Sequence, residues 1–405
     1  MPAASFAAVA TTDGSEKWDQ AIKREGDLYK RDKEIRSPFE RDYTRILHCT
    51  AYRRLKRKTQ VFFATTNDHV CTRIEHVNHV NSVSRTIAKH LGLNSELVDA
   101  ISIGHDLGHA PFGHKGEETL KYILEDFVKG ESFWHEKNSL HFVDDIEVLE
   151  GPEGKFCNLK LTYGVRDGIV CHCGEIDENS LFPRSEPIDL KKISKEDKIK
   201  PFTWEGCVVK VSDKIAYLGR DIEDAITLNV LTPDKLDELN GLLESSGVSA
   251  DIKINNTVLI HTFITDLCKN SSLDNGIALS DEKFNLMNKV KYFCYENIYN
   301  HAVLERYKKF VDHILKGLFE YLLQTVKNFC LFDKDSDNFC PKLSAEFIKY
   351  LKNFSNNCIC EDKYSETKKI YDLNNKDDWC IACIDYISGM TDQYAISRFK
   401  EIITY

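Results

Sequence analysis

Apolar side chains recur every three or four residues through most of the chain, which is the period of a helix with one buried face. Residues 76–91 carry such a stripe, and Gly92 is placed to end that helix. A second helix is predicted after a cap at Asn94 and Ser95, and its stripe ends just before His105. The pattern therefore predicts long amphipathic helices that pack around a common core.

The same period continues along the chain after two interruptions. Gly108 and Pro111 break it, and a further helix is predicted from about His114 to Phe127. Residues 177–201 hold three prolines and many charges without a period, which indicates a surface loop or excursion. Helices are expected again around residues 208–218 and through most of the chain after residue 233.

These elements predict an all-α fold with at most a small β-hairpin. Only 9 Pro and 20 Gly occur in 405 residues, too few for the many turns of a sandwich or barrel. We expect a mobile N-terminal arm over 1–16, a central core over 17–232, and a helical region over 233–405 that packs on the core.

The chain is acidic overall, but its charged residues are unevenly distributed along the sequence. The chain has 54 basic and 64 acidic side chains, a net charge of −10, which argues against a general nucleic-acid coat protein. Residues 17–60 nevertheless carry 14 Lys or Arg against 7 Asp or Glu. This local excess indicates either an anionic ligand nearby or a solvated basic helix face. Charges interrupt every apolar stretch well before about 18 residues, so no membrane span is expected.

Cysteine is abundant, with 14 residues, and the start of the chain lacks the basic and apolar regions of a secretory signal. We therefore expect reduced thiols and a cytoplasmic protein. One set of cysteines has spacing that could suit zinc, although the alternative, two thiols on a buried helix face, is also consistent with the pattern. The set is Cys358, Cys360, Cys380 and Cys383.

Histidine and aspartate gather on the helices described above. His76, the adjacent His105 and Asp106, and Asp213 lie on three helical segments, and these residue types bind borderline and hard divalent metals. Taken singly, an inward histidine is usually a core residue. Further bases crowd the same region beyond what packing needs: His109, His114, Glu117 and His135.

At these residues the sequence resembles the HD-domain deoxynucleoside triphosphate triphosphohydrolases, or dGTPase-like proteins. The matching strings, in family order, are RRLKRKTQVF (53–62), RIEHVNHV (73–80), SRTIAKHLGLN (84–94), HDLGHAPFGHKGEE (105–118), FWHEKNS (133–139), LTYGVRDGIV (161–170), VSDKIAYLGRDIED (211–224) and DYISGMTDQYA (385–395). The resemblance covers most of the chain and implies an HD-domain helical core with additional helices.

The resemblance also implies roles for single residues. His76, His105, Asp106 and Asp213 would bind the metal, and His109, His114, Glu117 and His135 would surround the attacking water and the phosphates. Arg73, Lys214 and Tyr217 look like phosphate contacts, and Gln60 and Asp221 look like the pair that reads the deoxyribose 3′-hydroxyl. The alternative for Arg73, Lys214 and Asp221 is an ordinary surface or interhelical charge. Two positions depart from the family string, Glu75 in place of threonine and His79 in place of glutamate.

The implied reaction releases a deoxynucleoside and inorganic triphosphate from a dNTP, by water attack at the α-phosphorus. Manganese is the expected ion, with magnesium, iron, cobalt and nickel as alternatives. A homo-oligomer, hexamer or dimer, is expected, and an allosteric dNTP and single-stranded DNA are candidate partners. Tyr299 and His301 are candidates for the base pocket, against a packing role. The rival functions are another HD-superfamily nucleotidase or phosphodiesterase, and a non-catalytic regulator that binds nucleotide or single-stranded DNA.

Overall fold

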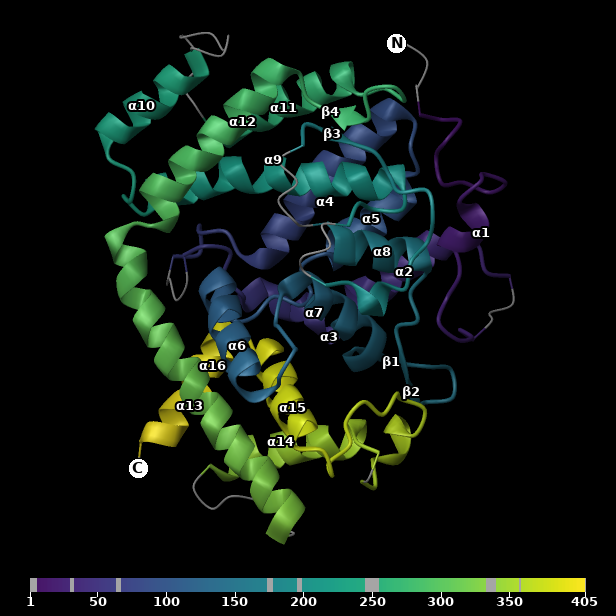
Figure 1. The fold of residues 1–405 in the computed structure, drawn as a ribbon, viewed down its shortest axis with the longest axis vertical. Coiled ribbons are helices and arrows are strands. Elements are labelled where there is room, and N and C mark those ends of the chain that lie inside the picture. The colour runs from purple at the N-terminus through teal and green to yellow at the C-terminus, as the bar shows by residue number, and fades with distance from the viewer. Residues whose placement is uncertain are drawn as a thin grey trace.

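A computed structural model describes residues 6–29, 33–62, 67–172, 178–194, 199–244, 255–332, 340–356 and 358–404. Figure 1 shows helices almost throughout. They are α1 (Trp18–Ala21), α2 (Pro38–His48), α3 (Thr50–Arg54), η1 (Leu55–Arg57), α4 (Arg73–Leu91), α5 (Ser95–Gly104), α6 (Gly113–Phe127), α7 (His135–His141), η2 (Phe142–Ile146), α8 (Tyr163–Cys171), η3 (Leu190–Lys192), α9 (Trp204–Thr227), α10 (Pro233–Glu244), α11 (Asn256–Asn270), α12 (Asp281–Cys294), η5 (Tyr295–Tyr299), α13 (Ala302–Phe332), α14 (Pro341–Phe354), η6 (Asp362–Tyr364), α15 (Lys376–Ser388) and α16 (Asp392–Ile403). The all-α prediction is confirmed.

The strands are β1 (Val148–Glu150), β2 (Phe156–Asn158), β3 (Ser180–Leu181) and β4 (Ile277–Ala278). The first two form the small antiparallel hairpin that was expected, with Leu149 opposite Cys157. The other two form a second antiparallel pair, with Leu181 opposite Ile277. This second pair joins the predicted loop excursion to a segment nearly a hundred residues later. No local sequence pattern predicts this pairing.

Local capping explains where the two central helices begin and end. The side chain of Glu75 accepts the Thr72 backbone N–H at 2.8 Å, which completes a capping box at the start of α4. Gly92 ends α4 with a φ of 82°, a left-handed conformation that suits glycine. Asn94 then accepts two backbone N–H groups of α5. Both predicted boundaries are therefore observed.

The helices share two apolar cores. The first is built mainly from α2, α4, α5, α8 and α9, with α10 to α12 packed on it. The second brings α6 together with α13 to α16, and Figure 1 shows the long α13 running along one side of the molecule from α12 toward α14. Helix α6 directly follows the segment of His105 and Asp106. The junction between the two cores therefore lies at the predicted chemistry.

The start of the chain needs a correction. Residues 6–16 were predicted as part of a mobile arm, yet Phe6 is fully buried and its N–H donates to the carbonyl of Leu91 at 3.1 Å. The backbone and hydroxyl of Thr11 both donate to the carboxylate of Glu205, at 2.9 and 2.8 Å. These contacts hold residues 6–16 on the folded body because they satisfy a buried carboxylate. Residues 1–5 lie outside the described residues.

The cysteine set follows the packing interpretation. Cys380 and Cys383 are buried in α15, and burial raises the pKa of Cys383 well above its usual value. Among the described residues, the side-chain groups that could hold a metal include no cysteine. Across the same residues, no helix combines the length and apolar character needed to cross a membrane.

Candidate active site

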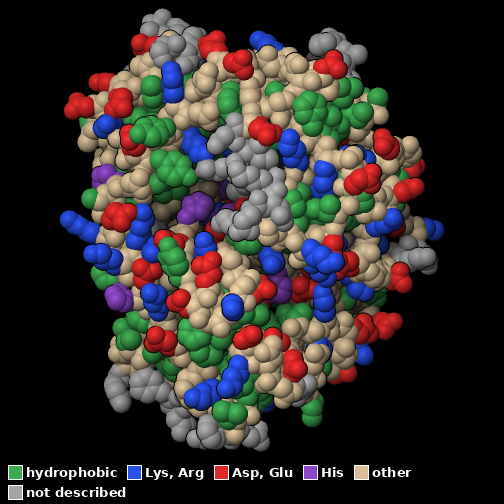
Figure 2. All heavy atoms as spheres, viewed as in Figure 1, with side chains coloured by type: hydrophobic (Ala, Val, Ile, Leu, Met, Phe, Trp, Pro, Cys, Tyr) green, Lys and Arg blue, Asp and Glu red, His purple; other side chains and the backbone are tan. Residues whose placement is uncertain are grey.

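A cavity of about 400 Å³ contains most of the residues that the sequence predicted for the site. Figure 2 shows a hollow near the centre of one face, with histidine visible in it and Lys and Arg side chains around it. Eleven of the thirteen predicted residues line the cavity: Gln60, Arg73, His76, Asp106, His109, His114, His135, Asp213, Lys214, Tyr217 and Asp221. The other two, His105 and Glu117, are buried behind the lining and contact it.

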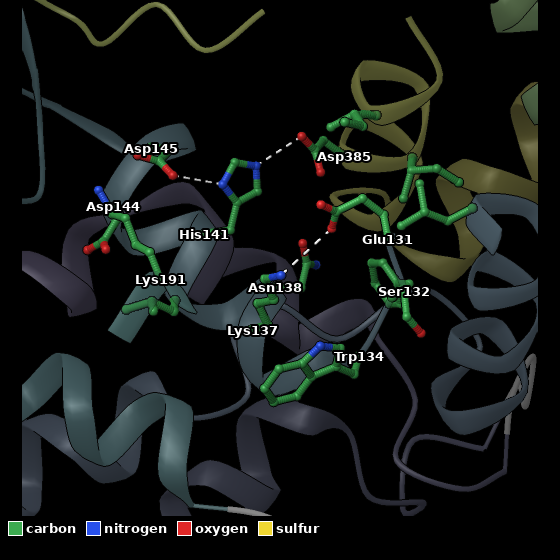
Figure 3. A pocket seen from close by; sticks show the side chains of 15 residues that line it. Glu131, Ser132, Trp134, Lys137, Asn138, His141, Asp144, Asp145, Lys191 and Asp385 are labelled. Carbon is green, nitrogen blue, oxygen red and sulfur yellow. Dashed lines mark hydrogen bonds and ion pairs between the residues drawn. The ribbon is translucent and has the colours of Figure 1, made fainter. Parts of the chain in front are cut away.

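Two other cavities have a different character. One, of about 320 Å³, lies beside α7, where the ring of His141 bridges Asp145 and Asp385 at 2.9 Å each (Figure 3). The other, of about 530 Å³, has many aromatic side chains from η2, α14 and α16. Neither is lined by any of the described His, Cys, Asp and Glu groups that could hold a metal. The described groups that could hold a metal therefore lie at the first cavity and not at these two.

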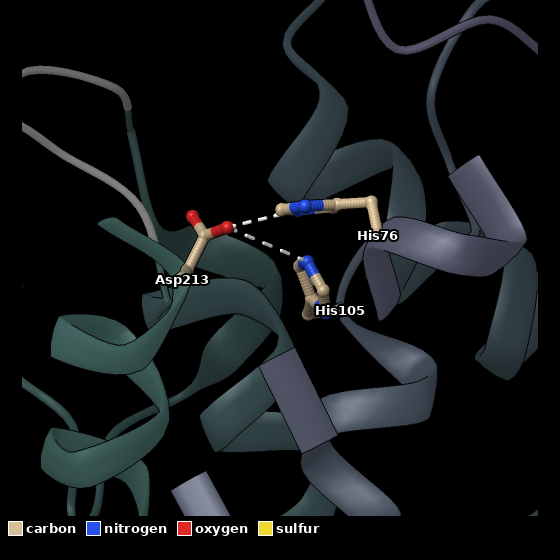
Figure 4. Close-up of side chains that lie close together, drawn as sticks. All are labelled: His76, His105 and Asp213. Atoms are coloured by element: carbon tan, nitrogen blue, oxygen red, sulfur yellow. Dashed lines mark ion pairs between the residues drawn. The ribbon is translucent and has the colours of Figure 1, made fainter. Parts of the chain in front are cut away.

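Three helical segments bring the predicted metal ligands together. His76 of α4 lies 3.0 Å from Asp213 of α9, between Nε2 and Oδ1, and His105 Nε2 lies 3.9 Å from the same oxygen (Figure 4). The carboxylate of Asp106 lies 3.8 Å from His76 Nε2 and 3.4 Å from His105 Nε2. We call this set, His76, His105, Asp106 and Asp213, the metal cluster.

The hydrogen bonding of His105 shows that the metal cluster fits a cation. Its Nδ1 donates to the carbonyl of Ser102 at 2.6 Å, which fixes the tautomer and leaves a lone pair on Nε2. Within the described part of the chain this fully buried Nε2 has no hydrogen-bond partner, and it faces two carboxylates. Nitrogen and oxygen lone pairs that converge without protons between them are stable when a divalent cation lies among them.

Arg73 adds a fixed positive charge at the edge of the metal cluster. Its Nη1 donates to Asp106 at 2.7 Å, and both side chains are buried. Its Nε and Nη2 are also buried but have no partner among the described residues. A guanidinium with spare donors at a cavity wall is suited to a phosphate. The neighbouring Glu75 caps α4, so its departure from the family string serves the helix start.

The predicted proton-handling groups lie close to Asp106, whose carboxylate is 3.0 Å from His109 Nδ1. The Nδ1 of His135 lies 2.9 Å from the carboxylate of Glu117, and the ring centroid of His109 is 3.8 Å from that of His135. Burial and the nearby Arg73 hold the pKa of His109 well below its usual value. His114 is different, because its side chain is 76% exposed at the mouth of the cavity.

Backbone packing explains how these bases come so close. At Gly108 an added Cβ would lie 2.1 Å from the backbone nitrogen of Ser139 on α7. Only glycine allows the segment after Asp106 to touch α7 in this way. Asn138, also on α7, donates to the carbonyl of Gly108 at 2.6 Å. The close approach places His109 against His135.

Two further buried polar groups, Gln60 and Asp221, line the same cavity. Gln60 Oε1 and Asp221 Oδ1 are buried and have no partner in the described residues. The other carboxylate oxygen of Asp221 accepts the hydroxyl of Tyr299 at 2.6 Å, and burial raises the pKa of Asp221 to about 7. Tyr299 lines the cavity, but His301 is not among the lining residues.

Four further basic residues that line the cavity were not predicted: His172, Lys210, Lys291 and Lys308. His172 follows α8, two residues after the string LTYGVRDGIV, and its ring centroid lies 4.8 Å from that of His105. Burial and the rings of His105 and His135 lower the pKa of His172 to about 4. Lys210 precedes Asp213 by one helical turn, so spacing could have found it.

Comparison with known proteins identifies the family. Residues 73–218 match the HD domain family. The chain is 34% identical over 371 residues to a deoxyguanosinetriphosphate triphosphohydrolase-like protein of Caldanaerobacter subterraneus subsp. tengcongensis, covering 91% of this chain and 86% of the relative. It is 35% identical over 409 residues to a protein of that description from Pelagibacter ubique, covering 94% and 97%. The chain therefore belongs to the deoxyguanosinetriphosphate triphosphohydrolase-like family of HD-domain proteins.

Proposed function

We propose that the protein is a metal-dependent triphosphohydrolase that converts a dNTP into a deoxynucleoside and inorganic triphosphate. The observation that carries this proposal is the set of groups that meet at one cavity. His76, Asp106 and Asp213 of the metal cluster line it together with Arg73, several lysines, and the buried acceptors of Gln60 and Asp221. This set offers partners for a metal-bound phosphate chain and for a sugar hydroxyl.

In this reaction a water oxygen bonds to the α-phosphorus while the bond from phosphorus to the 5′-oxygen breaks. A divalent ion in the metal cluster would act as a Lewis acid that lowers the pKa of a water and neutralises phosphate charge. Arg73, Lys210 and Lys214 would hold the triphosphate, because charge stabilisation contributes most to catalysis at phosphorus. The same cations would hold the triphosphate product until it leaves the cavity.

Proton transfer falls to the bases beside Asp106. The contact with Glu117 fixes the imidazole of His135, so that its other nitrogen can take a proton from water or give one to the departing 5′-oxygen. His109 stacks against His135 and completes this proton path, while the exposed His114 would meet the triphosphate at the mouth.

Product analysis tests the proposal. The purified protein is incubated with each dNTP, singly and in pairs, with manganese and in parallel with magnesium, iron, cobalt or nickel. We expect equal amounts of deoxynucleoside and triphosphate, and none with His105→Ala. Release of phosphate or pyrophosphate would favour another HD-superfamily hydrolase, and tight binding without turnover would favour a regulator. The homo-oligomer, the cytoplasmic location, the allosteric dNTP and the single-stranded DNA stay predictions.

A further inference from the structure

Two strings that carry the family resemblance, KTQVF and DYISGMTDQYA, contain buried ionisable side chains that the proposed chemistry does not use. Both meet at the segment that joins α5 to α6, residues 105–112, which we call the α5–α6 loop. The ammonium of Lys58 donates to the carbonyl of His109 at 2.5 Å and to that of Ser388 at 2.7 Å. Lys58 is only 2% exposed. Because a buried ammonium is costly unless bonded, this lysine ties the backbone of His109 firmly to the end of α15.

Asp392, the first residue of α16, holds the other end of the loop. One carboxylate oxygen accepts the N–H of Phe112 at 2.9 Å, and the other accepts the N–H and hydroxyl of Thr59 at 3.2 and 2.7 Å. Phe112 has a φ of 65°, a conformation that is unfavourable for a large side chain. The bond to Asp392 therefore stabilises a strained residue immediately before α6, which carries His114 and Glu117.

We propose that Lys58 and Asp392 are positioning residues for catalysis. They fix the α5–α6 loop so that His109 and the first turn of α6 face the reacting phosphorus, and neither side chain lines the cavity. The inference rests on the proposed function for what the loop does. It makes α15 and α16 part of the catalytic apparatus, although both lie outside the residues that match the HD domain.

Matched variants separate positioning from simple stability. Lys58→Met removes the donors, and Lys58→Arg keeps donors at that place. The control for the lysine is Lys17→Met, because Lys17 also donates to two carbonyls, those of Arg184 and Phe202, both at 2.7 Å and away from the cavity. Asp392→Asn removes one acceptor, and its control is Glu205→Gln. Glu205 is likewise buried and accepts backbone N–H groups from two distant segments.

We expect Lys58→Met and Asp392→Asn to lower kcat about 10- to 100-fold, since a misplacement of about 1 Å has effects of this size. KM for dGTP and bound metal per chain should stay within twofold, and Lys58→Arg should recover part of the rate. Lys17→Met and Glu205→Gln should lower Tm but keep kcat. Equal kcat losses in the controls, or unchanged kcat in folded Lys58→Met and Asp392→Asn, would overturn the proposal.

A second readout separates this inference from the proposed function. With histidine labelled by ¹⁵N, the imidazole resonances of His109 should shift in Lys58→Met and in Asp392→Asn and stay in place in Lys17→Met. If the unmodified protein hydrolyses no dNTP, the proposed function fails while these shifts still report positioning. If the resonances do not move, positioning fails whatever the substrate is. Should Lys58→Met not fold, Lys58→Arg and Asp392→Asn decide the question.

Discussion

Removal of the substrate's 3′-hydroxyl should slow the reaction by an amount that the structure sets. Asp221 Oδ1 and Gln60 Oε1 are both buried and lack a partner in the described residues, so a ligand hydroxyl is the donor they require. Because burial raises the pKa of Asp221 to about 7, the comparison is made above pH 7, where this carboxylate is mainly charged. A hydrogen bond to a charged group contributes about 1.5–3 kcal/mol, and a hydroxyl has one proton to give. A 2′,3′-dideoxynucleotide should therefore lose roughly 10- to 150-fold in kcat/KM relative to the 2′-deoxynucleotide.

The assay compares triphosphate release from dGTP and 2′,3′-dideoxy-GTP. Gln60→Ala and Asp221→Asn should reduce the difference between the two substrates to a few-fold, because the first removes an acceptor and the second removes the charge that strengthens the bond to the hydroxyl. Asp224→Asn is the matched control, since this buried carboxylate lies nearly one turn further along α9 and accepts the N–H of Cys71 outside the cavity. Equal kcat/KM for both substrates in the unmodified protein would refute the reasoning, as would an undiminished difference in both variants.

Three further predictions follow from the site and its surroundings. His105→Ala should lose bound metal and turnover together, and full metal occupancy by elemental analysis would count against its role. Glu117→Ala should keep the metal and lose roughly 10²-fold in kcat, whereas a rate within a few-fold of normal would remove Glu117 from proton transfer. Burial opposes charge on His141, but Asp385 and Asp145 prevail and raise its pKa to about 10. Because this folded-state pKa exceeds the usual 6.5, the charged ring stabilises the fold fully below pH 6.5, and this contribution disappears as pH rises toward 10. The ring is a quarter exposed, so we expect the free energy of unfolding of His141→Gln to be lower than that of the unmodified protein by roughly 1–4 kcal/mol at pH 6. This difference should shrink by pH 10. A difference that stays constant with pH would contradict the prediction.

Local sequence signals predicted the elements that depend on local physics. Gly92 and Asn94 marked the boundary between α4 and α5 because a left-handed glycine and a capping side chain act within one turn. Phe6 and Thr11 were misjudged, since their segment has no helical period and is held by contacts with Leu91 and Glu205 far along the chain.

The residues of the candidate site also fall into those that local sequence predicted and those that depend on tertiary packing. The family strings indicated the residues of α4, α6 and α9 that line the cavity. Lys291 and Lys308 lie on α12 and α13, so their arrival at the cavity depends on how those helices pack, which no local period encodes. Tyr299 was a candidate for the base pocket, against a packing role, and its bond to Asp221 could be found only in three dimensions.

The link between Thr59 and Asp392 spans 333 positions, and this separation has a consequence for the newly made protein. Translation adds about 5–20 residues per second, so roughly 10–35 s pass between the synthesis of Asp213 and that of Asp392. During that interval all four residues of the metal cluster exist, but the α5–α6 loop lacks its contact with Asp392. If the proposed function and the positioning role hold, full activity should therefore begin only when the final helices have left the ribosome.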